Sequence, residues 1–196
     1  MKKLKVRSLL NPFTQIAGYQ ALGWGVAGIA VSILLSYLSG WHYHGLLHYG
    51  PAPNPAWWCF VAEHLIIWLV PAILFYVGGL ILSRSRIRIV DILGTVAFAQ
   101  LPFIGMGLFN FLPPMQYLLK FNADTSPVAL LAKPEFLLAV WLSLFSFIFV
   151  IWVLYWMFKA LQVSCNLKGS RLGILYAIAV LGGDTLCRLL ISQCYK

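Results

Sequence analysis

The stretch EFLLAVWLSLFSFIFVIWVLYWMF, residues 135–158, decides the class of fold. It carries no charged residue after Glu135, and about 20 apolar residues are enough for a helix to cross the hydrocarbon core of a bilayer. The sequence therefore predicts a membrane-spanning helix here. Four further stretches have the same character and complete a single predicted membrane domain over residues 1–196: residues 21–39, 56–82, 89–112 and 172–192.

The composition of the whole chain agrees with this prediction. Hydrophobic residues make up 61% and charged residues 10% of the 196 residues, whereas a soluble domain has about 25% charged residues. The predicted fold class is an all-α integral membrane protein, a bundle of five transmembrane helices in contact with membrane lipids. The net charge of +9 is typical of some nucleic-acid-binding proteins, but the basic residues gather at the ends of the predicted spans. We therefore expect no nucleic-acid partner.

The distribution of basic residues predicts the orientation of the bundle. Ten of the fourteen Lys and Arg residues precede the first span or lie in the turns after the second and fourth spans. Because Lys and Arg concentrate on the cytoplasmic side of membrane proteins, we predict that the N-terminus is inside and the C-terminus outside. Residues 40–55, which contain three histidines and neither Lys nor Arg, are then an outer loop.

Small residues recur along the first span at spacings of three and four. Residues at these spacings share one face of a helix, and small side chains allow two helix backbones to approach closely. We predict a helix-packing seam formed by Ala17, Ala21, Gly25 and Gly28.

Four ionisable residues inside predicted spans stand out, because each costs several kcal/mol there. Glu63 and His64 belong to the second span, and Asp184 and Arg188 to the fifth. At about 1.5 Å per residue, all four lie in the outer half of the membrane, so we infer one buried polar cluster that links the two spans. Two interpretations stay open: an internal cluster that locks helix packing, with an Asp184–Arg188 ion pair, or a site that binds an ion, proton or small solute from outside.

Other chemistry has weaker support in the sequence. Imidazole and carboxylate ligands for zinc are present, but their spacing matches no zinc signature, so we expect no metal and no other cofactor. The candidate ligands of this alternative are His44, His48, Glu63 and His64. The four cysteines show no CxxC spacing, which indicates free thiols. No serine lies in a GxSxG motif, and we expect no enzymatic activity.

Three short motifs resemble segments of a known family. The entry SLLNPF at residues 8–13, where Asn11 and Pro12 predict a helix start, resembles the lead-in of bacterial members of the Yip family of five-span membrane proteins. The stretch DILGTVAF at residues 91–98 with Pro102 resembles the third span of the family, and residues 159–169 resemble its last cytoplasmic turn. The resemblance implies a five-helix membrane fold. Eukaryotic members interact with Ypt/Rab GTPases, but their Asp-Leu-Tyr-Gly-Pro signature is absent here, which favours a bacterial-type member in a bacterial cytoplasmic membrane.

These observations favour a binding role over chemistry. We expect a non-enzymatic membrane adaptor or accessory subunit, whose partner is another integral membrane protein or a second copy of the chain. One alternative is a small-solute or ion transporter that uses the outer-half polar cluster. A further alternative is an outward-facing metal-binding membrane protein.

Overall fold

The structure of the protein is a computed structural model that describes residues 10–51, 55–119 and 130–195. In this part of the chain five helical segments are long and apolar enough to cross a membrane, which confirms the predicted all-α membrane fold. They are Gly18–Ser39 (α2), Trp57–Leu82 (α3), Ile89–Phe109 (α4 with α5), Pro134–Ser164 (α8) and Gly169–Gln193 (α9). Six of the basic residues counted above lie outside the described residues: Lys2, Lys3, Lys5, Arg7, Lys120 and Lys196.

The third span lies at the centre of the bundle and is not one continuous helix. It consists of α4 (Ile89–Ala99) and α5 (Pro102–Phe109), which meet at Gln100 and Leu101. The break falls directly before Pro102, whose ring nitrogen cannot donate a helical hydrogen bond. Next to the break, the side-chain amide of Gln100 donates to the backbone carbonyl of Ile67 in α3 at 2.9 Å. This carbonyl lacks a helical donor because residue 71, four positions further along α3, is proline. In this span 67% of the most apolar stretch is buried, a larger share than in any other of the five.

The packing of α2 against α4 and α5 depends on glycine. A Cβ atom added at Gly25 would lie 2.5 Å from the Cβ of Ala97, and one added at Gly28 would lie 2.1 Å from Cδ2 of Leu101. Ala21 is fully buried on the same face. Ala17, by contrast, precedes the helix as its N-cap and is exposed, so it lies outside this contact. The backbones of α2 and α4 therefore approach as closely as small residues permit.

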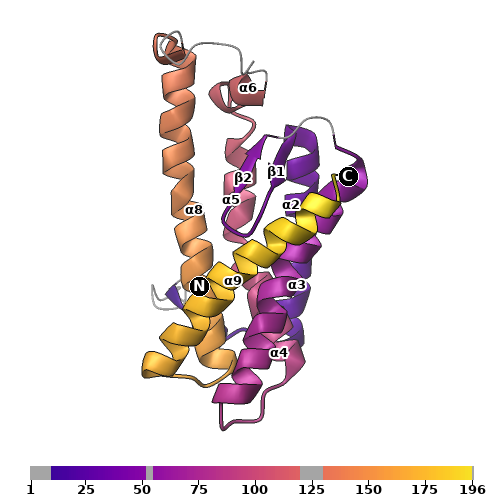
Figure 1. Ribbon diagram of the computed structural model, residues 1–196, viewed down its shortest axis with the longest axis vertical. Coiled ribbons are helices and arrows are strands. Elements are labelled where there is room, and N and C mark those ends of the chain that lie inside the picture. The colour runs from indigo at the N-terminus through magenta and orange to yellow at the C-terminus, as the bar shows by residue number, and fades with distance from the viewer. Residues whose placement is uncertain (1–9, 52–54, 120–129, 196) are drawn as a thin grey trace, which may run out of the picture.

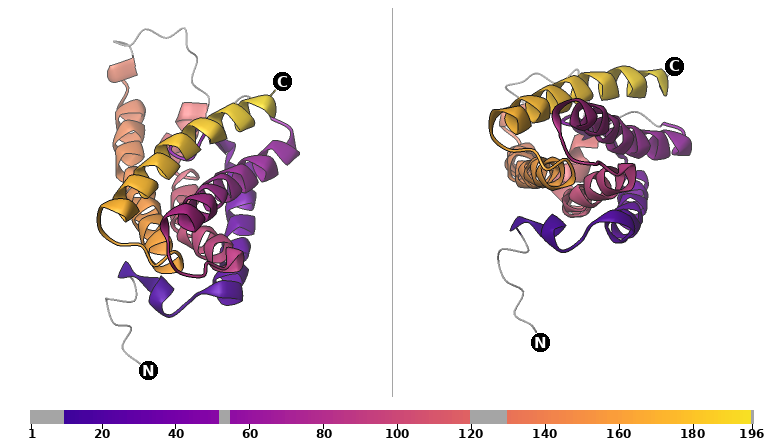
Figure 2. Two further views of the ribbon diagram at one scale, coloured as in Figure 1. Left: turned by 60° about the horizontal axis from the view of Figure 1, so that its bottom comes forward. Right: turned by 90° about the horizontal axis from the view of Figure 1, so that it is seen from below.

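The two last spans differ in how they join the bundle. The helix α8 has 31 residues and continues past residue 158 to Ser164, because the residues that follow include the good helix formers Lys159, Ala160 and Leu161. It runs along one side of the molecule (Figure 1). The helix α9 lies alongside α3, as both further views show (Figure 2).

The segment before the first span forms a short 3₁₀ turn, η1 (Pro12–Thr14), rather than an α-helix. Asn11 occupies the N-cap position, but its side chain makes no capping hydrogen bond. Phe13 fixes the turn instead: its ring is 2% exposed and meets the rings of Phe98 and Trp156 edge-on at 5.9 and 6.3 Å. The turn is therefore held by aromatic packing rather than by capping.

The loop between the first two spans folds into a β-hairpin. Its strands are β1 (Trp41–Tyr43) and β2 (Tyr49–Pro51), which pair in antiparallel fashion. All three residues of β1 are less than 5% exposed, so the hairpin packs into the bundle, beside α5 and α2 in Figure 1. The short helix α6 (Pro113–Leu119) lies at the same end of the bundle. The hairpin brings polar groups of the loop to the charged residues of the spans.

Candidate functional site

Two carboxylates, one on each of two neighbouring helices, hold the hairpin. Glu63 projects from α3 and is fully buried, and Asp184 projects from α9 and is 8% exposed. Buried carboxylates are stable only where hydrogen-bond donors or cations replace water. In this protein the hairpin provides donors to both.

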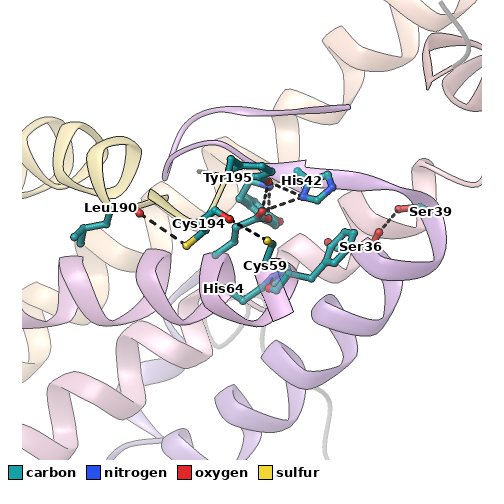
Figure 3. A network of polar contacts seen from close by, with 11 residues as sticks. Ser36, Ser39, His42, Cys59, His64, Leu190, Cys194 and Tyr195 are labelled. Atoms are coloured by element: carbon teal, nitrogen blue, oxygen red, sulfur yellow. Dashed lines mark hydrogen bonds and ion pairs between the residues drawn. The ribbon is translucent and has the colours of Figure 1, made fainter. Parts of the chain in front are cut away.

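Glu63 binds the first strand and the C-terminal end of the described chain. One carboxylate oxygen, Oε1, lies 2.9 Å from Nδ1 of His42, and the other, Oε2, accepts the backbone N–H of Tyr43 at 3.1 Å. The phenol of Tyr195 donates to Oε1 as well and lies 2.9 Å from Nδ1 of His42. Figure 3 shows Tyr195 and His42 converging on this point. A single carboxylate thus joins α3, β1 and the residues that follow α9.

Asp184 binds the turn of the hairpin. Its Oδ1 accepts the backbone N–H of Leu47 at 2.8 Å, and its Oδ2 lies 3.3 Å from Nδ1 of His48. Arg188, one helical turn further along α9, places Nε 3.6 Å from Oδ2 and also hydrogen-bonds the ring of His48. Gly45 makes this approach possible, since an added Cβ there would lie 2.8 Å from Oδ1 of Asp184.

The four charged residues expected in one cluster therefore lie in two groups. Asp184 and Arg188 do form an i,i+4 ion pair. Glu63 makes no hydrogen bond or ion pair with either, among the contacts of the described residues. His64 turns back on its own helix: Nδ1 donates to the carbonyl of Phe60 at 2.7 Å, and its ring meets that of Tyr43 edge-on. The hairpin, not a direct contact, connects the two groups.

The four candidate metal ligands are also divided between different contacts. His48 lies against Asp184 and Arg188, Glu63 lies against His42, and His64 bonds to a backbone carbonyl. The rings of His44 and His42 are 6.3 Å apart. Within the described residues no group of three His, Cys, Asp or Glu side chains is arranged to hold a metal ion.

The phenols around Glu63 remain hydrogen-bond donors. Burial raises the pKa of Tyr195, and its hydrogen bond to Glu63 together with the nearby negative charge raises it further. Burial is also the main cause that raises the pKa of Tyr43 well above its ordinary value, with Tyr49 and Glu63 contributing. A protonated phenol can donate a hydrogen bond to a carboxylate oxygen. The arrangement is suited to fastening chain segments together.

Three partners around the hairpin were not predicted from the sequence. Tyr195 follows the last span, and only its aromatic ring beside the end of α9 indicated an interface role. Asn110 ends α5 and donates its side-chain amide to the phenol oxygen of Tyr49 on β2. His42 lies two positions before His44, one of the histidines considered as metal ligands. Its pairing with Glu63, 21 residues away, has no local signal.

Five apolar helices with a hairpin folded against one end define a multi-pass α-helical integral membrane protein. Within that class the chain belongs to the Yip1 domain family, whose model matches residues 7–186. This confirms the resemblance drawn from the sequence motifs. The match includes Glu63 and Asp184 but ends before Arg188 and Tyr195. No curated protein and no solved structure matches the chain.

Proposed function

We propose that this protein is a non-enzymatic adaptor or accessory subunit that associates with another integral membrane protein, in a bacterial cytoplasmic membrane. The observation that carries the proposal is the exposed face of α8. Only 11% of its most apolar stretch is buried, against 67% in the third span. A helix that packs so little within its own chain offers the longest apolar surface of the molecule to other membrane components.

The residues on that face favour a protein partner over lipid alone. Trp141, Phe145 and Ile151 are 68%, 56% and 64% exposed. Large aromatic side chains are enriched where protein surfaces bind one another, and they account for much of the binding energy there. We therefore assign α8 as the docking helix.

The charged residues support a structural role beside this binding function. Glu63 and Asp184 already accept hydrogen bonds from the hairpin, Glu63 through both of its oxygens. A transported ion or solute would have to displace these donors. For this reason we do not assign transport to the polar groups.

Photo-crosslinking in native membranes tests the proposal. A photoreactive amino acid replaces Ile151 on α8 in one variant and Ile178 on α9 in the matched control, which is equally exposed at 65%. We expect Ile151 to give one adduct of defined mass with a membrane protein, and the same protein to co-purify in stoichiometric amount with the unmodified chain. The control position should not form this adduct. Adducts with lipid alone, or only with a second copy of this chain, would contradict the proposal.

A further inference from the structure

At the end of the bundle opposite the hairpin, two turns enclose a basic cavity. One turn joins α3 to α4 and the other joins α8 to α9, and both lie at the lower end of the molecule in Figure 1. The cavity has a volume of about 230 Å³. Three basic side chains line it, namely Arg84, Lys168 and Arg171. All three are exposed to solvent and, among the described residues, none forms an ion pair with a carboxylate.

The two turns are fixed relative to each other. The side-chain amide of Asn166 donates to the hydroxyl of Ser85 at 3.2 Å and bridges them. The backbone N–H of Ser85 in turn donates to the hydroxyl of Ser83 at 3.0 Å. Leu82 and Leu167 form an apolar part of the wall. The cations are thus held around a defined hollow instead of being scattered over a flexible loop.

The helix α9 adds to the positive potential of the cavity. Its N-cap is Lys168, which makes no side-chain capping hydrogen bond. The first backbone N–H groups of an α-helix have no partner within the helix, and the helix dipole favours an anion beside them. Together with Arg84 and Arg171, which can bind two oxygens of one anion at once, this favours a ligand with several anionic oxygens.

The depth of the cavity points to the source of that ligand. The helix α3 ends at Leu82, α8 ends at Ser164 and α9 begins at Gly169, so the cavity lies directly at the ends of three candidate spans. This is the level of the lipid headgroups, and anionic headgroups attract basic side chains at the cytoplasmic surface. The predicted orientation also places this end in the cytoplasm.

We propose that the cavity lined by Arg84, Lys168 and Arg171 binds a phosphate group, carried by the headgroup of an anionic lipid at the inner membrane surface. Phosphate has the charge and the several oxygens that the cations and the helix terminus recognise. The acyl chains of such a lipid would extend along the apolar surface of the spans. A free phosphate ion shares the same chemistry, and the experiment separates the two sources.

Lipid binding by the purified protein in detergent tests the site. Native mass spectrometry measures retention of phosphatidic acid and of diacylglycerol, which has the same tails without the phosphate. We expect one phosphatidic acid molecule per protein and no retained diacylglycerol. Arg84→Gln, Lys168→Gln and Arg171→Gln should each weaken phosphatidic acid binding about tenfold, as expected for the loss of one hydrogen bond between a basic side chain and the phosphate.

Arg86→Gln is the matched control, because Arg86 belongs to the same turn as Arg84 but does not line the cavity. It removes the same charge and should change binding less than twofold. In a second arm, inorganic phosphate is added as a competitor of phosphatidic acid. Chloride at equal ionic strength is the control anion.

If inorganic phosphate competes weakly, the lipid is the source of the bound phosphate group. If inorganic phosphate binds as tightly as the lipid, the free ion is the source. Both results support the site. Absence of binding in both arms, or equal weakening by Arg86→Gln, would overturn it. Because the substituted residues are exposed, circular dichroism and elution profiles should match those of the unmodified protein.

Discussion

Replacing Glu63 with glutamine should release the hairpin from α3 while leaving the five-helix bundle assembled. Glu63 is fully buried and accepts hydrogen bonds from His42, from the backbone of Tyr43 and from Tyr195. Glutamine has nearly the same shape, but only one of its two terminal atoms accepts hydrogen bonds. At least one buried donor therefore loses its partner in the variant.

The size of the effect follows from that count. If the amide oxygen takes the position of Oε1, the N–H of Tyr43 faces an NH₂ group and is left unpaired. An unsatisfied buried donor costs about 1–3 kcal/mol, so we take about 2 kcal/mol for local opening of the hairpin. A free-energy difference of about 2 kcal/mol changes the equilibrium constant for hairpin opening about thirtyfold, so the opened population rises by this factor.

Hydrogen exchange measured by mass spectrometry on the purified protein provides the assay. In Glu63→Gln, the amides of residues 41–51 should exchange about thirtyfold faster than in the unmodified protein, while those of α4 keep their protection. Glu135→Gln is the matched control, since Glu135 is an exposed carboxylate at the start of α8. It should leave exchange in the hairpin unchanged.

A graded variant keeps the test informative if Glu63→Gln fails to fold. Tyr195→Phe removes one donor to Glu63 and leaves the bonds from His42 and Tyr43 in place. We expect an effect of about 1 kcal/mol, or about fivefold in exchange. If hairpin exchange in both variants stays within twofold of the unmodified protein, Glu63 does not hold the hairpin and the reasoning is wrong.

Two further predictions concern the packing seam and the titration of Tyr195. Gly25→Ala should destabilise the bundle by about 1–3 kcal/mol, because the new methyl group would lie 2.5 Å from the Cβ of Ala97. At Gly23 an added Cβ meets nothing within 4 Å, so the control Gly23→Ala should be neutral or slightly stabilising. Thermal unfolding in detergent compares the two variants. The pKa of Tyr195 is raised in the folded protein above its ordinary value of 10.0, so its contribution to stability is fully present below pH 10 and is lost progressively as pH rises above it. Hairpin protection should therefore fall above about pH 10, and Tyr195→Phe should flatten this dependence.

The spans were predictable because a bilayer imposes a simple requirement on sequence. A helix that crosses it must be apolar over about 20 residues, and residues 135–158 meet that requirement without any tertiary information. The break between α4 and α5 was not predicted, although Pro102 marks it. Proline inside a predicted span is compatible with both a kinked and an interrupted helix, and here the amide of Gln100 bonding to α3 accompanies the interruption.

The hairpin was not predictable from local pattern. Within residues 40–55 only residues 41–44 alternate between aromatic residues and histidines, and the residues that follow contain two glycines and three prolines. The usual strand signal, an alternation over about four to eight residues, is therefore weak here. The strands have three residues each, and a short isolated hairpin is at best marginally stable. Tertiary contacts hold it: Glu63 and Asp184 bind its backbone N–H groups at Tyr43 and Leu47. Such pairings join residues up to 137 positions apart, beyond the reach of sequence spacing.

The hairpin in turn explains why charged residues are tolerated inside two spans. Asp184 has Arg188 as a permanent countercharge on its own helix. The ion pair of Glu63 is with His42, which carries charge only when protonated, so donors from the hairpin and from Tyr195 must replace most of its hydration. Removal of the hairpin would leave Asp184 paired with Arg188 but would leave the carboxylate of Glu63 with Tyr195 as its remaining donor among the described residues. Folding of the hairpin and burial of Glu63 are therefore interdependent, whereas the Asp184 ion pair can form within α9 alone.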